Sequence, residues 1–263
     1  MKPNKILILL LAIIVFGACH TPSVEEEQWE SLFNGKDLTG WTPKIAGYKV
    51  GDNYGNTFRV EDGLLKVSYS EYDTFETRFG HLFYEKPYSN YKLRVEYRFV
   101  GEQMPGVGSW AYKNNGVMFH SQSAESMNLD QGFPVSLEAQ FLGGNDTISN
   151  RPTGNLCTPG LHVMLDDTLL TDHCLNSSSK TVKGEEWVTF ELVVEGDEIM
   201  HHIVDGDTVM TYSKPVVGGD FLPKNYPIEV GTPVKSGYFA LQSESHPIEF
   251  RKVEILDLSV YED

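Results

Sequence analysis

The sequence predicts an all-β fold, a single sandwich of two antiparallel sheets, and three observations support this. Short segments alternate apolar and polar residues, as in YKLRVEYRFV (91–100), which is the period of a strand with one buried face. Turn-forming pairs such as Asn34-Gly35 and Asp205-Gly206 recur between these segments. No segment keeps a helical apolar period over three turns. Many short strands separated by turn signals favour a sandwich.

The chain begins with an export signal. The positive MKPNK is followed by the apolar run ILILLLAIIVFG and then by Ala18 and Cys19, which is the layout of a signal peptide. A cysteine at the cleavage point resembles the bacterial lipoprotein signal, in which that cysteine is lipidated. An uncleaved membrane anchor is the alternative, although the run is short for a membrane span.

This N-terminus sets the expected domain organisation and location. We expect a lipoprotein signal peptide over 1–18, a polar tether over 19–28 and one domain over 29–263. A lipid on Cys19 would hold the protein in the cell envelope, on the periplasmic or cell-surface face of the outer membrane. The membrane would be contacted through this anchor alone.

The predicted strands follow one another along the domain. TFRVEDGLLKVSY (57–69) predicts a hairpin that turns at Asp62-Gly63, and 91–100 predicts a strand. The stretch 187–212 predicts three consecutive strands joined by tight turns, and 237–244 and 248–260 predict the closing strands. We see no internal repeat and no linker other than the tether.

The charge of the chain and its cysteine content limit the partners and the covalent bonds that we expect. The formal net charge of −16 repels phosphate backbones, so nucleic acid is an unexpected partner. Outside the cytoplasm, Cys157 and Cys174 can form a disulfide, which would stabilise the fold by about 3 kcal/mol in the chain-entropy model. Two buried free thiols are the alternative, and metal ligation is weaker because only His173 adjoins them.

Several strands carry hydrogen-bonding groups on the face opposite the apolar one. In VSLEAQFLGG (135–144), Glu138 and Gln140 oppose Leu137, Ala139 and Phe141. Strands 116–122, 160–165 and 237–244 place polar residues in the same way, and these are His120, His162, Gln242 and Glu244. Such faces could line a concave sugar-binding sheet. They could equally be the solvated outer faces that antiparallel sheets commonly have.

Six blocks of the sequence together resemble one protein family, from about Trp29 to Leu258. The blocks are LFNGKDLTGW (32–41), FRVEDGLLKV (58–67), NNGVMFH (114–120), SLEAQFLGG (136–144), EEWVTFELVVEGDEIMHHIVDG (185–206) and FALQSESHPIEFRKVEI (239–255). They resemble the bacterial 3-keto-disaccharide hydrolase domain, long catalogued as a domain of unknown function. The stretches RPTGNLCTPG and DHCLNSSSKT resemble a branch with the same cysteine pair. The resemblance implies a concanavalin A-like jelly roll and cleavage of glycosides first oxidised to a ketone at C3.

The resemblance also assigns residues. Glu138 and Gln140 match the glutamate-x-glutamine strand of the family, and Gln242 and Glu244 match its closing block. His202 matches a histidine three residues before a turn. His120 stands where many members carry arginine, and His162 stands where this branch more often has another polar residue, so the substrate preference is open.

The implied chemistry is elimination followed by hydration. A ketone at C3 acidifies the C2 hydrogen, so the group at C1 can leave and water can add back. This reaction needs a base with a pKa near the working pH, a donor for the C3 oxygen and an acid for the leaving oxygen. We expect Glu138 to act as base or acid, with His120 as its catalytic partner. The residues expected to bind the sugar are Gln140, Gln242, Glu244, His202, His162, His81, Trp110 and Tyr112.

Other functions remain open at this point. A conventional retaining glycosidase needs two carboxylates about 5–5.5 Å apart, and SLEAQF has one acid, so only a cross-strand pair such as Glu138 and Glu244 would serve. A non-catalytic sugar-binding lipoprotein fits the same fold, and Glu138 could be a structural carboxylate. An adhesion module has no specific support. We expect no cofactor and no catalytic metal, although the acidic loop 69–76 could hold a structural calcium.

Overall fold

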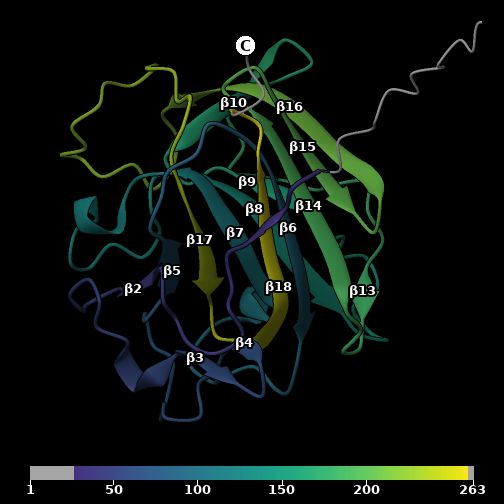
Figure 1. Cartoon of the computed structure of the whole chain (residues 1–263). Helices are drawn as coiled ribbons and strands as arrows, with labels where there is room; N and C mark the ends of the chain where they lie inside the picture. The colour runs from purple at the N-terminus through teal and green to yellow at the C-terminus, as the bar shows by residue number, and fades with distance from the viewer. Residues whose placement is uncertain (1–26, 260–263) are drawn as a thin grey trace, which may run out of the picture.

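Two β-sheets pack face to face in a computed structural model, which describes residues 27–259 (Figure 1). This confirms the predicted all-β, two-sheet jelly-roll sandwich of the concanavalin A type. The expected signal peptide over 1–18, the lipidation site Cys19 and most of the tether lie outside the described residues. The helical elements bounded within the described residues are short 3-10 turns, namely η1 (Tyr54–Asn56), η2 (Ser109–Ala111) and η3 (Ala124–Ser126).

One sheet has ten strands. Its strands run in the order β11-β10-β16-β15-β14-β6-β18-β4-β3, and β1 pairs with β18. Their bounds are β1 (Glu30–Ser31), β3 (Phe58–Glu61), β4 (Leu64–Val67), β6 (Asn90–Phe99), β10 (Leu161–Leu165), β11 (Thr168–Leu170), β14 (Val188–Glu195), β15 (Ile199–Val204), β16 (Asp207–Val217) and β18 (Ile248–Asp257).

The other sheet has eight strands, and its outer face carries the polar residues that the sequence pattern singles out. Its order is β12-β9-β8-β7-β17-β5-β2, with β13 pairing in parallel to β8. The bounds are β2 (Trp41–Ile45), β5 (Gly80–Tyr84), β7 (Asn114–Ser121), β8 (Leu137–Gly144), β9 (Asn155–Cys157), β12 (Cys174–Leu175), β13 (Val182–Lys183) and β17 (Tyr238–Ser243). That parallel pair departs from the predicted all-antiparallel pattern.

The predicted hairpins form where the turn signals stand. Strands β3 and β4 join at Asp62-Gly63, whose φ angles are 56° and 76°, as a two-residue turn with two left-handed positions requires. The predicted stretch 187–212 becomes β14, β15 and β16 in consecutive antiparallel pairing. Alternation along β6 buries every second residue, so this strand contributes one apolar face to the core.

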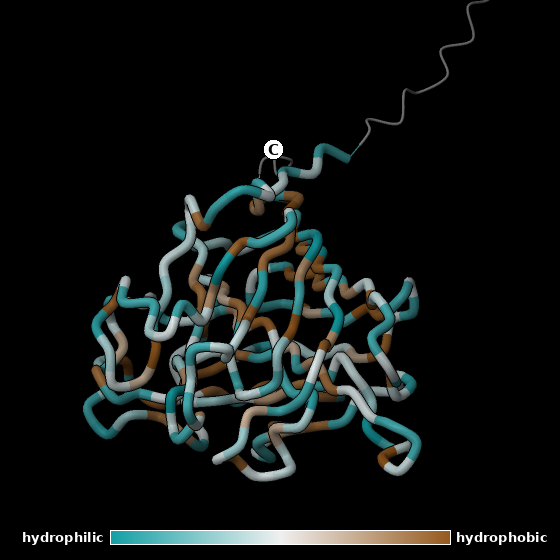
Figure 2. Tube along the Cα trace, turned by 90° about the horizontal axis from the view of Figure 1, so that it is seen from below, coloured by the Kyte–Doolittle hydropathy of each residue, from teal (hydrophilic) through white to brown (hydrophobic). Residues whose placement is uncertain are grey.

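The core lies between the sheets and is rich in aromatic residues. Tyr97 of β6 stacks on Phe141 of β8 with centroids 4.1 Å apart, and Phe141 meets Phe190 of β14 at 5.0 Å. Burying each such ring stabilises the fold by about 1.5–3 kcal/mol. Figure 2 shows the resulting pattern, in which hydrophobic and hydrophilic residues mix along the strands while hydrophilic ones dominate many outer loops.

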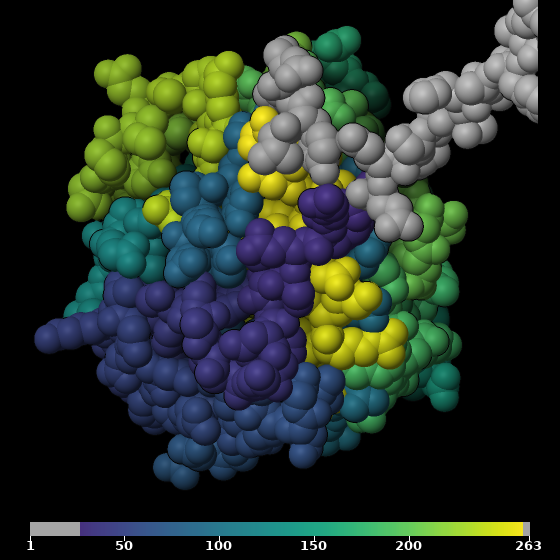
Figure 3. Space-filling model, in the orientation of Figure 1, coloured from purple at the N-terminus to yellow at the C-terminus, as the bar shows by residue number. Residues whose placement is uncertain are grey.

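Both ends of the domain meet on the ten-stranded sheet. Strand β1 pairs with β18 near the C-terminus, and Figure 3 shows this N-terminal segment lying beside the C-terminal residues. Trp41, which begins β2, is buried and donates from Nε1 to the Leu32 carbonyl at 2.8 Å, so it belongs to the core. Within residues 27–259 we find no helix of the length and apolarity that a membrane span needs.

Candidate active site

Strand β8 presents Glu138 and Gln140 on the outer face of the eight-stranded sheet. Its alternate residues Leu137, Ala139 and Phe141 are fully buried toward the other sheet. The period of two therefore sends the carboxyl and the amide to the opposite side. Glu138 is nevertheless 5% exposed, so this face is covered and is no ordinary solvated surface.

Strand register places further polar groups beside Glu138 and Gln140. Glu138 lies opposite Met118 of β7, and Gln140 lies opposite Gly116. On the far side of β7, strand β17 contributes Gln242, whose own partner on β5 is His81. Long-range pairing thus assembles one polar surface from strands far apart in the chain.

Gly116 makes room for the Glu138 carboxyl. A Cβ atom at position 116 would lie 2.6 Å from Glu138 Oε1 and 2.9 Å from its Cγ. Real Cβ atoms do not approach that closely, so any other residue would push the carboxyl away. Gly116 does not have a positive φ angle, so its requirement here is space above the strand.

Two carboxyl groups share this surface and are both held toward their protonated forms. Burial raises the pKa of Glu138 to about 8, although the nearby Gln242 amide lowers it. Burial, and then the Glu138 charge, raise the pKa of Glu244 well above its usual value, while Arg151 opposes this. Like charges in one desolvated site cannot both ionise easily, so the two groups titrate as a pair.

Arg151, in the loop between β8 and β9, is a cation that acts on Glu244, and sequence reasoning missed it. Its guanidinium donates to the carbonyls of Gly143 at 3.0 Å and Trp110 at 2.6 Å, and also to that of Tyr112. These bonds fix the guanidinium and the 109–112 turn together. A loop arginine has no strand alternation to mark it, so the sequence offered no signal.

The polar groups line a cavity of about 670 Å³. Its polar lining includes Glu138, Gln140, Glu244, Arg151 and Asn114. Buried atoms of these lining residues without a hydrogen-bond partner include Glu138 Oε1, Glu244 Oε2 and Asn114 Oδ1. Buried polar atoms are normally paired. Their concentration here indicates that a polar ligand completes them.

Asn114 is a second residue that sequence reasoning missed, and here a signal was available. It shares the face of Gly116 and Met118 by alternation along β7. The same alternation that identified Glu138 therefore applies to it.

Aromatic rings form one wall of the cavity. Trp110 stacks against Phe79 with centroids 6.2 Å apart, Phe79 meets Phe133 at 5.0 Å, and Phe133 meets Phe221 at 5.6 Å. Trp110 and Phe221 are more than half exposed, at 53% and 55%. Large exposed rings beside polar groups are typical of a ligand site. Of this wall, only Trp110 was predicted.

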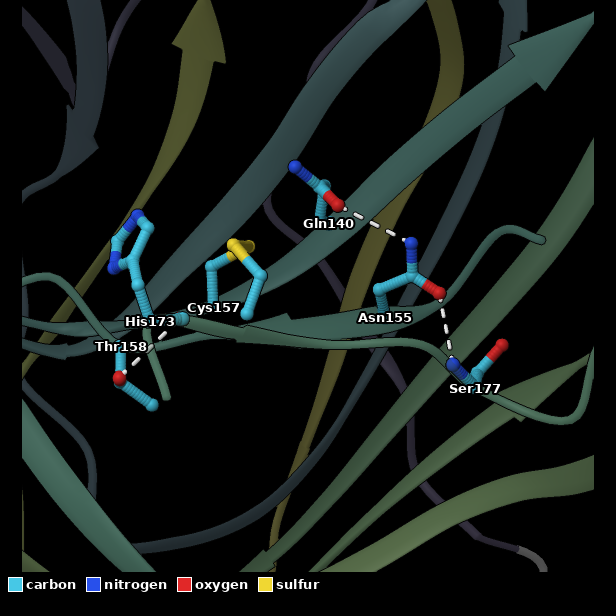
Figure 4. Close-up of a disulfide and its surroundings, with 7 residues drawn as sticks. Gln140, Asn155, Cys157, Thr158, His173 and Ser177 are labelled. Atoms are coloured by element: carbon cyan, nitrogen blue, oxygen red, sulfur yellow. Dashed lines mark hydrogen bonds between the residues drawn. A yellow bond between two sulfur atoms is a disulfide. The ribbon is translucent and has the colours of Figure 1, made fainter. Parts of the chain in front are cut away.

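A disulfide between Cys157 and Cys174 forms part of the cavity floor, as the sequence predicted (Figure 4). Cys157 lies opposite Glu138 in the register of β8 and β9. His173 also lines the cavity, and its carbonyl accepts from the Thr158 amide at 2.9 Å. Asn155 bridges to Gln140 at 3.2 Å and to Ser177 at 2.9 Å, so the floor is held by side chains as well.

Metal-ligand residues gather at one place among residues 27–259. Cys157, His173 and Cys174 lie within 4.8 Å of one another through their ligand atoms. The disulfide occupies both sulfurs, so the group does not fit a metal. The acidic loop 69–76, where a calcium was considered possible, forms no comparable group in the described part of the chain.

His120 is turned away from Glu138, which corrects its predicted role as catalytic partner. Its backbone has a φ of 47°, next to a register shift between β7 and β17. The ring Nε2 lies 2.8 Å from the carbonyl of Gly196, in the turn between β14 and β15 of the other sheet. Alternation fails here because the irregular backbone rotates the side chain to the opposite face.

His202 lies in the core, so the predicted sugar contact is also corrected. Its ring bonds the Gly154 carbonyl at 2.9 Å and the Tyr212 hydroxyl at 2.8 Å, and burial lowers its pKa to about 4. On β15 the residues Met200, His202 and Val204 all face inward. The histidine is therefore a neutral structural group.

Three other predicted binding residues do not line the cavity. His162 is on β10 of the ten-stranded sheet, beside Gly218, and does not line the cavity. The Tyr112 hydroxyl accepts from the Asn145 amide at 3.3 Å, and its carbonyl accepts from the Arg151 guanidinium. Tyr112 therefore helps to position Arg151. His81 is fully buried beside Gln242, and burial followed by the Lys44 charge lowers its pKa to about 3.

Three comparisons with known proteins place the chain. A family model described as the 3-keto-alpha-glucoside-1,2-lyase-like domain matches residues 28–256. No protein of curated function matches the sequence. Two crystal structures from Parabacteroides distasonis ATCC 8503, both of proteins provisionally named glycosyl hydrolases, share the fold.

The similarity to these structures extends over most of the chain. The first is 20% identical with a TM-score of 0.55 and covers 88% of this chain and 94% of its own. The second is 17% identical with a TM-score of 0.52 and covers 87% and 98%. Identities this low establish the fold only. The family match over nearly the whole domain establishes more, and it supports a carbohydrate-active role: the chain belongs to the 3-keto-alpha-glucoside-1,2-lyase-like domain family.

Proposed function

We propose that the protein cleaves glycosides whose sugar ring carries a ketone at C3, by elimination across C1 and C2 followed by addition of water. The observation that carries this proposal is the buried carboxyl pair, Glu138 and Glu244, in a cavity with an aromatic wall. A pair whose members resist ionisation can hold one proton and accept another near neutral pH. Both activities are needed at adjacent carbons of the sugar.

Glu138 is the proposed base. Its pKa of about 8 lies near working pH, and Gln242 stabilises the ionised form. As a carboxylate it removes the hydrogen from C2, and the electron pair moves into the C2–C3 bond and onto the ketone oxygen. Arg151 lines the same cavity and is the proposed stabiliser of that enolate oxygen.

Glu244 is the proposed acid. Its pKa is raised well above the ordinary value, so it keeps its proton while Glu138 is ionised. The enolate electrons expel the oxygen at C1, and Glu244 protonates that oxygen as the bond breaks. The products of this step are an alcohol and a ring with a C1–C2 double bond conjugated to the ketone.

Hydration reverses the proton positions. Glu244, now a carboxylate, takes a proton from water as the water oxygen attacks C1. Glu138, now protonated, exchanges its proton with the water that enters the cavity and delivers a solvent proton to C2. The net reaction is hydrolysis, and both carboxyls return to their starting states.

A retaining glycosidase is the second candidate, because the fold brings together the cross-strand pair Glu138 and Glu244. Its nucleophile must be ionised at rest, whereas here the pKa values of both carboxyls are raised. A sugar-binding lipoprotein without turnover is the third. The cavity alone would serve it equally well.

A paired turnover assay separates these functions. The purified protein and the Glu138→Gln variant receive a 3-keto glucoside and its unoxidised parent, and release of the aglycone is followed. Release from the keto substrate alone, lost in the variant, is expected. Release from both substrates would indicate an ordinary glycosidase. Release from neither, with sugar binding retained by both proteins, would indicate a binding protein.

A further inference from the structure

A row of polar side chains crosses the outer face of the eight-stranded sheet beside the candidate site. Lys44 of β2 lies opposite His81 of β5, and His81 lies opposite Gln242 of β17. Directly opposite residues in antiparallel strands have Cβ atoms about 4.5–5.5 Å apart on the same face. Each side chain of the row can therefore reach the next one.

Gly116 extends this row to Glu138. The pairing of Leu241 with Val117 places the next residue, Gln242, beside Gly116 on β7. Gly116 has no side chain, and the Glu138 carboxyl occupies the space above it. The Gln242 amide is near enough to that carboxyl to lower the pKa of Glu138. The row thus ends at the proposed base.

His81 and Gln242 are both fully buried and lack partners. Both ring nitrogens of His81 and both polar atoms of the Gln242 amide have no hydrogen-bond partner within residues 27–259. Buried polar groups are normally paired. A neutral imidazole has one donor and one acceptor nitrogen, and an amide has a donor nitrogen and an acceptor oxygen. The two facing groups can therefore satisfy each other by rotation about their side-chain bonds.

Lys44 complements the other side of the imidazole. It is buried, and its Nζ donates to the carbonyls of Ile45 at 3.1 Å and Leu129 at 2.9 Å. An ammonium group has three donors, so one remains for the His81 ring. Burial and then the Lys44 charge lower the pKa of His81 to about 3. The ring is therefore neutral near neutral pH and keeps one acceptor nitrogen.

We propose that His81 is a positioning residue for the base Glu138. Its ring N–H donates to Gln242 Oε1 and so turns the amide nitrogen toward the Glu138 carboxyl, while Lys44 donates to the other ring nitrogen. An N–H donated to a carboxylate stabilises its ionised form. The inference rests on the proposed function, because it concerns the ionisation of the proposed base.

Other charged or titratable groups face this row or the base from neighbouring elements, and these are Asp130, Glu244, Arg151 and His173. They act on the pKa of Glu138 with or without the His81 ring. The quantity that tests His81 is therefore the change in this pKa between variants.

The pKa of Glu138 is measured without substrate, from the infrared absorption of its protonated carboxyl, which Glu138→Gln identifies. In His81→Phe we expect this pKa to rise by about one unit, because the amide is free to turn its oxygen toward the carboxyl. His81→Asn and His81→Gln keep an N–H donor near the places of ring Nδ1 and Nε2, and one of them should restore the wild-type pKa.

The kinetic consequence is a loss of rate at neutral pH. At about pH 7, kcat/KM of His81→Phe for a 3-keto glucoside should fall about tenfold, because less Glu138 is ionised. The rise of kcat/KM with pH should move upward by the same amount as the infrared pKa. A loss that is the same at every pH would overturn the assignment.

Phe83→Leu is the matched control, because Phe83 is a buried ring beside His81, with centroids 6.2 Å apart, and has no hydrogen-bonding group. It should lower thermal stability and leave the pKa of Glu138 unchanged. An unchanged pKa in His81→Phe, an equal shift in Phe83→Leu, or failure of both amide variants to restore the pKa would overturn the assignment.

A second measurement uses the wild-type protein and does not depend on the folding of any variant. In ¹⁵N NMR, His81 should show one protonated and one unprotonated ring nitrogen between about pH 5 and 9. A doubly protonated ring in this range would overturn the assignment. The infrared and NMR measurements use no substrate, so a shifted pKa without turnover of any 3-keto glycoside would remove the proposed function and leave the action of His81 on Glu138 standing.

Discussion

The outer faces of the two sheets carry similar sequence patterns but differ in whether their charged groups are paired. On the ten-stranded sheet, Arg94 meets Glu191 at 2.6 Å, and Arg98 meets Glu249 at 2.6 Å. On the eight-stranded sheet, Glu138 and Glu244 are buried, and each has a carboxyl oxygen without a hydrogen-bond partner. One face pairs its charges, and the other leaves its carboxyls unpaired.

The comparison shows where the protein retains an unfavourable arrangement. Partly exposed ion pairs contribute about 0–1 kcal/mol each, so the ion pairs on the ten-stranded sheet add little to stability. Buried polar atoms without partners cost free energy. Such a cost is typical of functional sites, where groups await a ligand. Pairing and burial, which alternation does not reveal, therefore distinguish the site from the solvated face.

The largest expected difference is in catalysis. Glu138→Gln should lower kcat for a 3-keto substrate by about 10²–10⁴-fold, because the base that attacks C2 is lost. The fold should remain intact, since a neutral amide replaces a buried acid of similar shape. Steady-state kinetics with melting curves measure both. Retained turnover in this variant would show that another residue is the base.

Gly116→Ala should have the next largest effect. The new methyl group would displace the Glu138 carboxyl, which lies 2.6 Å from the added Cβ position. A misplacement of that kind costs up to about 10²-fold in kcat, with a smaller change in KM. The Ala139 carbonyl, 2.9 Å from the same position, should add a stability loss of about 1–3 kcal/mol.

A double-mutant cycle shows whether Gly116 acts through Glu138. If it does, Gly116→Ala in the Glu138→Gln background should cause little further loss of kcat. Additive losses would indicate that Gly116 supports the sheet rather than the carboxyl.

The pH dependence of stability should also distinguish the faces. The pKa of Glu138 rises from 4.5 to about 8 on folding, so the folded state binds more protons across that range. Its free energy of unfolding then falls as pH rises toward 8. The buried histidines His81, His202 and His246 have folded pKa values of about 3 to 4, against 6.5 for a free histidine. Their contribution to the pH dependence of stability therefore falls below pH 6.5.

Urea unfolding between about pH 6.5 and 8 isolates the carboxyl contribution. Wild type should lose stability across this window, and Glu138→Gln should lose less. An identical slope in the two proteins would show that Glu138 is ionised in the folded state, against the pKa assigned to it.

The smallest effect is expected on the outer face of the ten-stranded sheet. Glu191→Gln removes one partner of Arg94 but should cost under about 1 kcal/mol and leave turnover unchanged. The measurement is urea unfolding at two salt concentrations. A loss of catalysis here would mean that the two faces are coupled, and the contrast between them would fail.

Sequence periodicity predicted the sandwich well because alternation and turn chemistry are local. The hairpin at Asp62-Gly63 and the polar face of β8 follow directly from it. His120 and His202 show its limit. A left-handed backbone at a register shift turns one away, and strand phase buries the other.

Residues contributed by loops could not be predicted from the sequence, for a different reason. Arg151 and Phe221 come to the cavity only through tertiary packing of long connections. Nothing in their neighbourhoods along the chain specifies that position. Asn114 lies on a strand, and consistent use of alternation along β7 would have included it.

The fate of the C2 hydrogen tests the central claim most directly. The reaction of a 3-keto glucoside in heavy water is followed by mass spectrometry and NMR of the released sugar, with wild type and Glu138→Gln. We predict deuterium at C2 of the product, a slower rate when C2 carries deuterium at the start, and loss of turnover in the variant. Release of a sugar that keeps its original C2 hydrogen would contradict proton abstraction by the buried carboxyl pair.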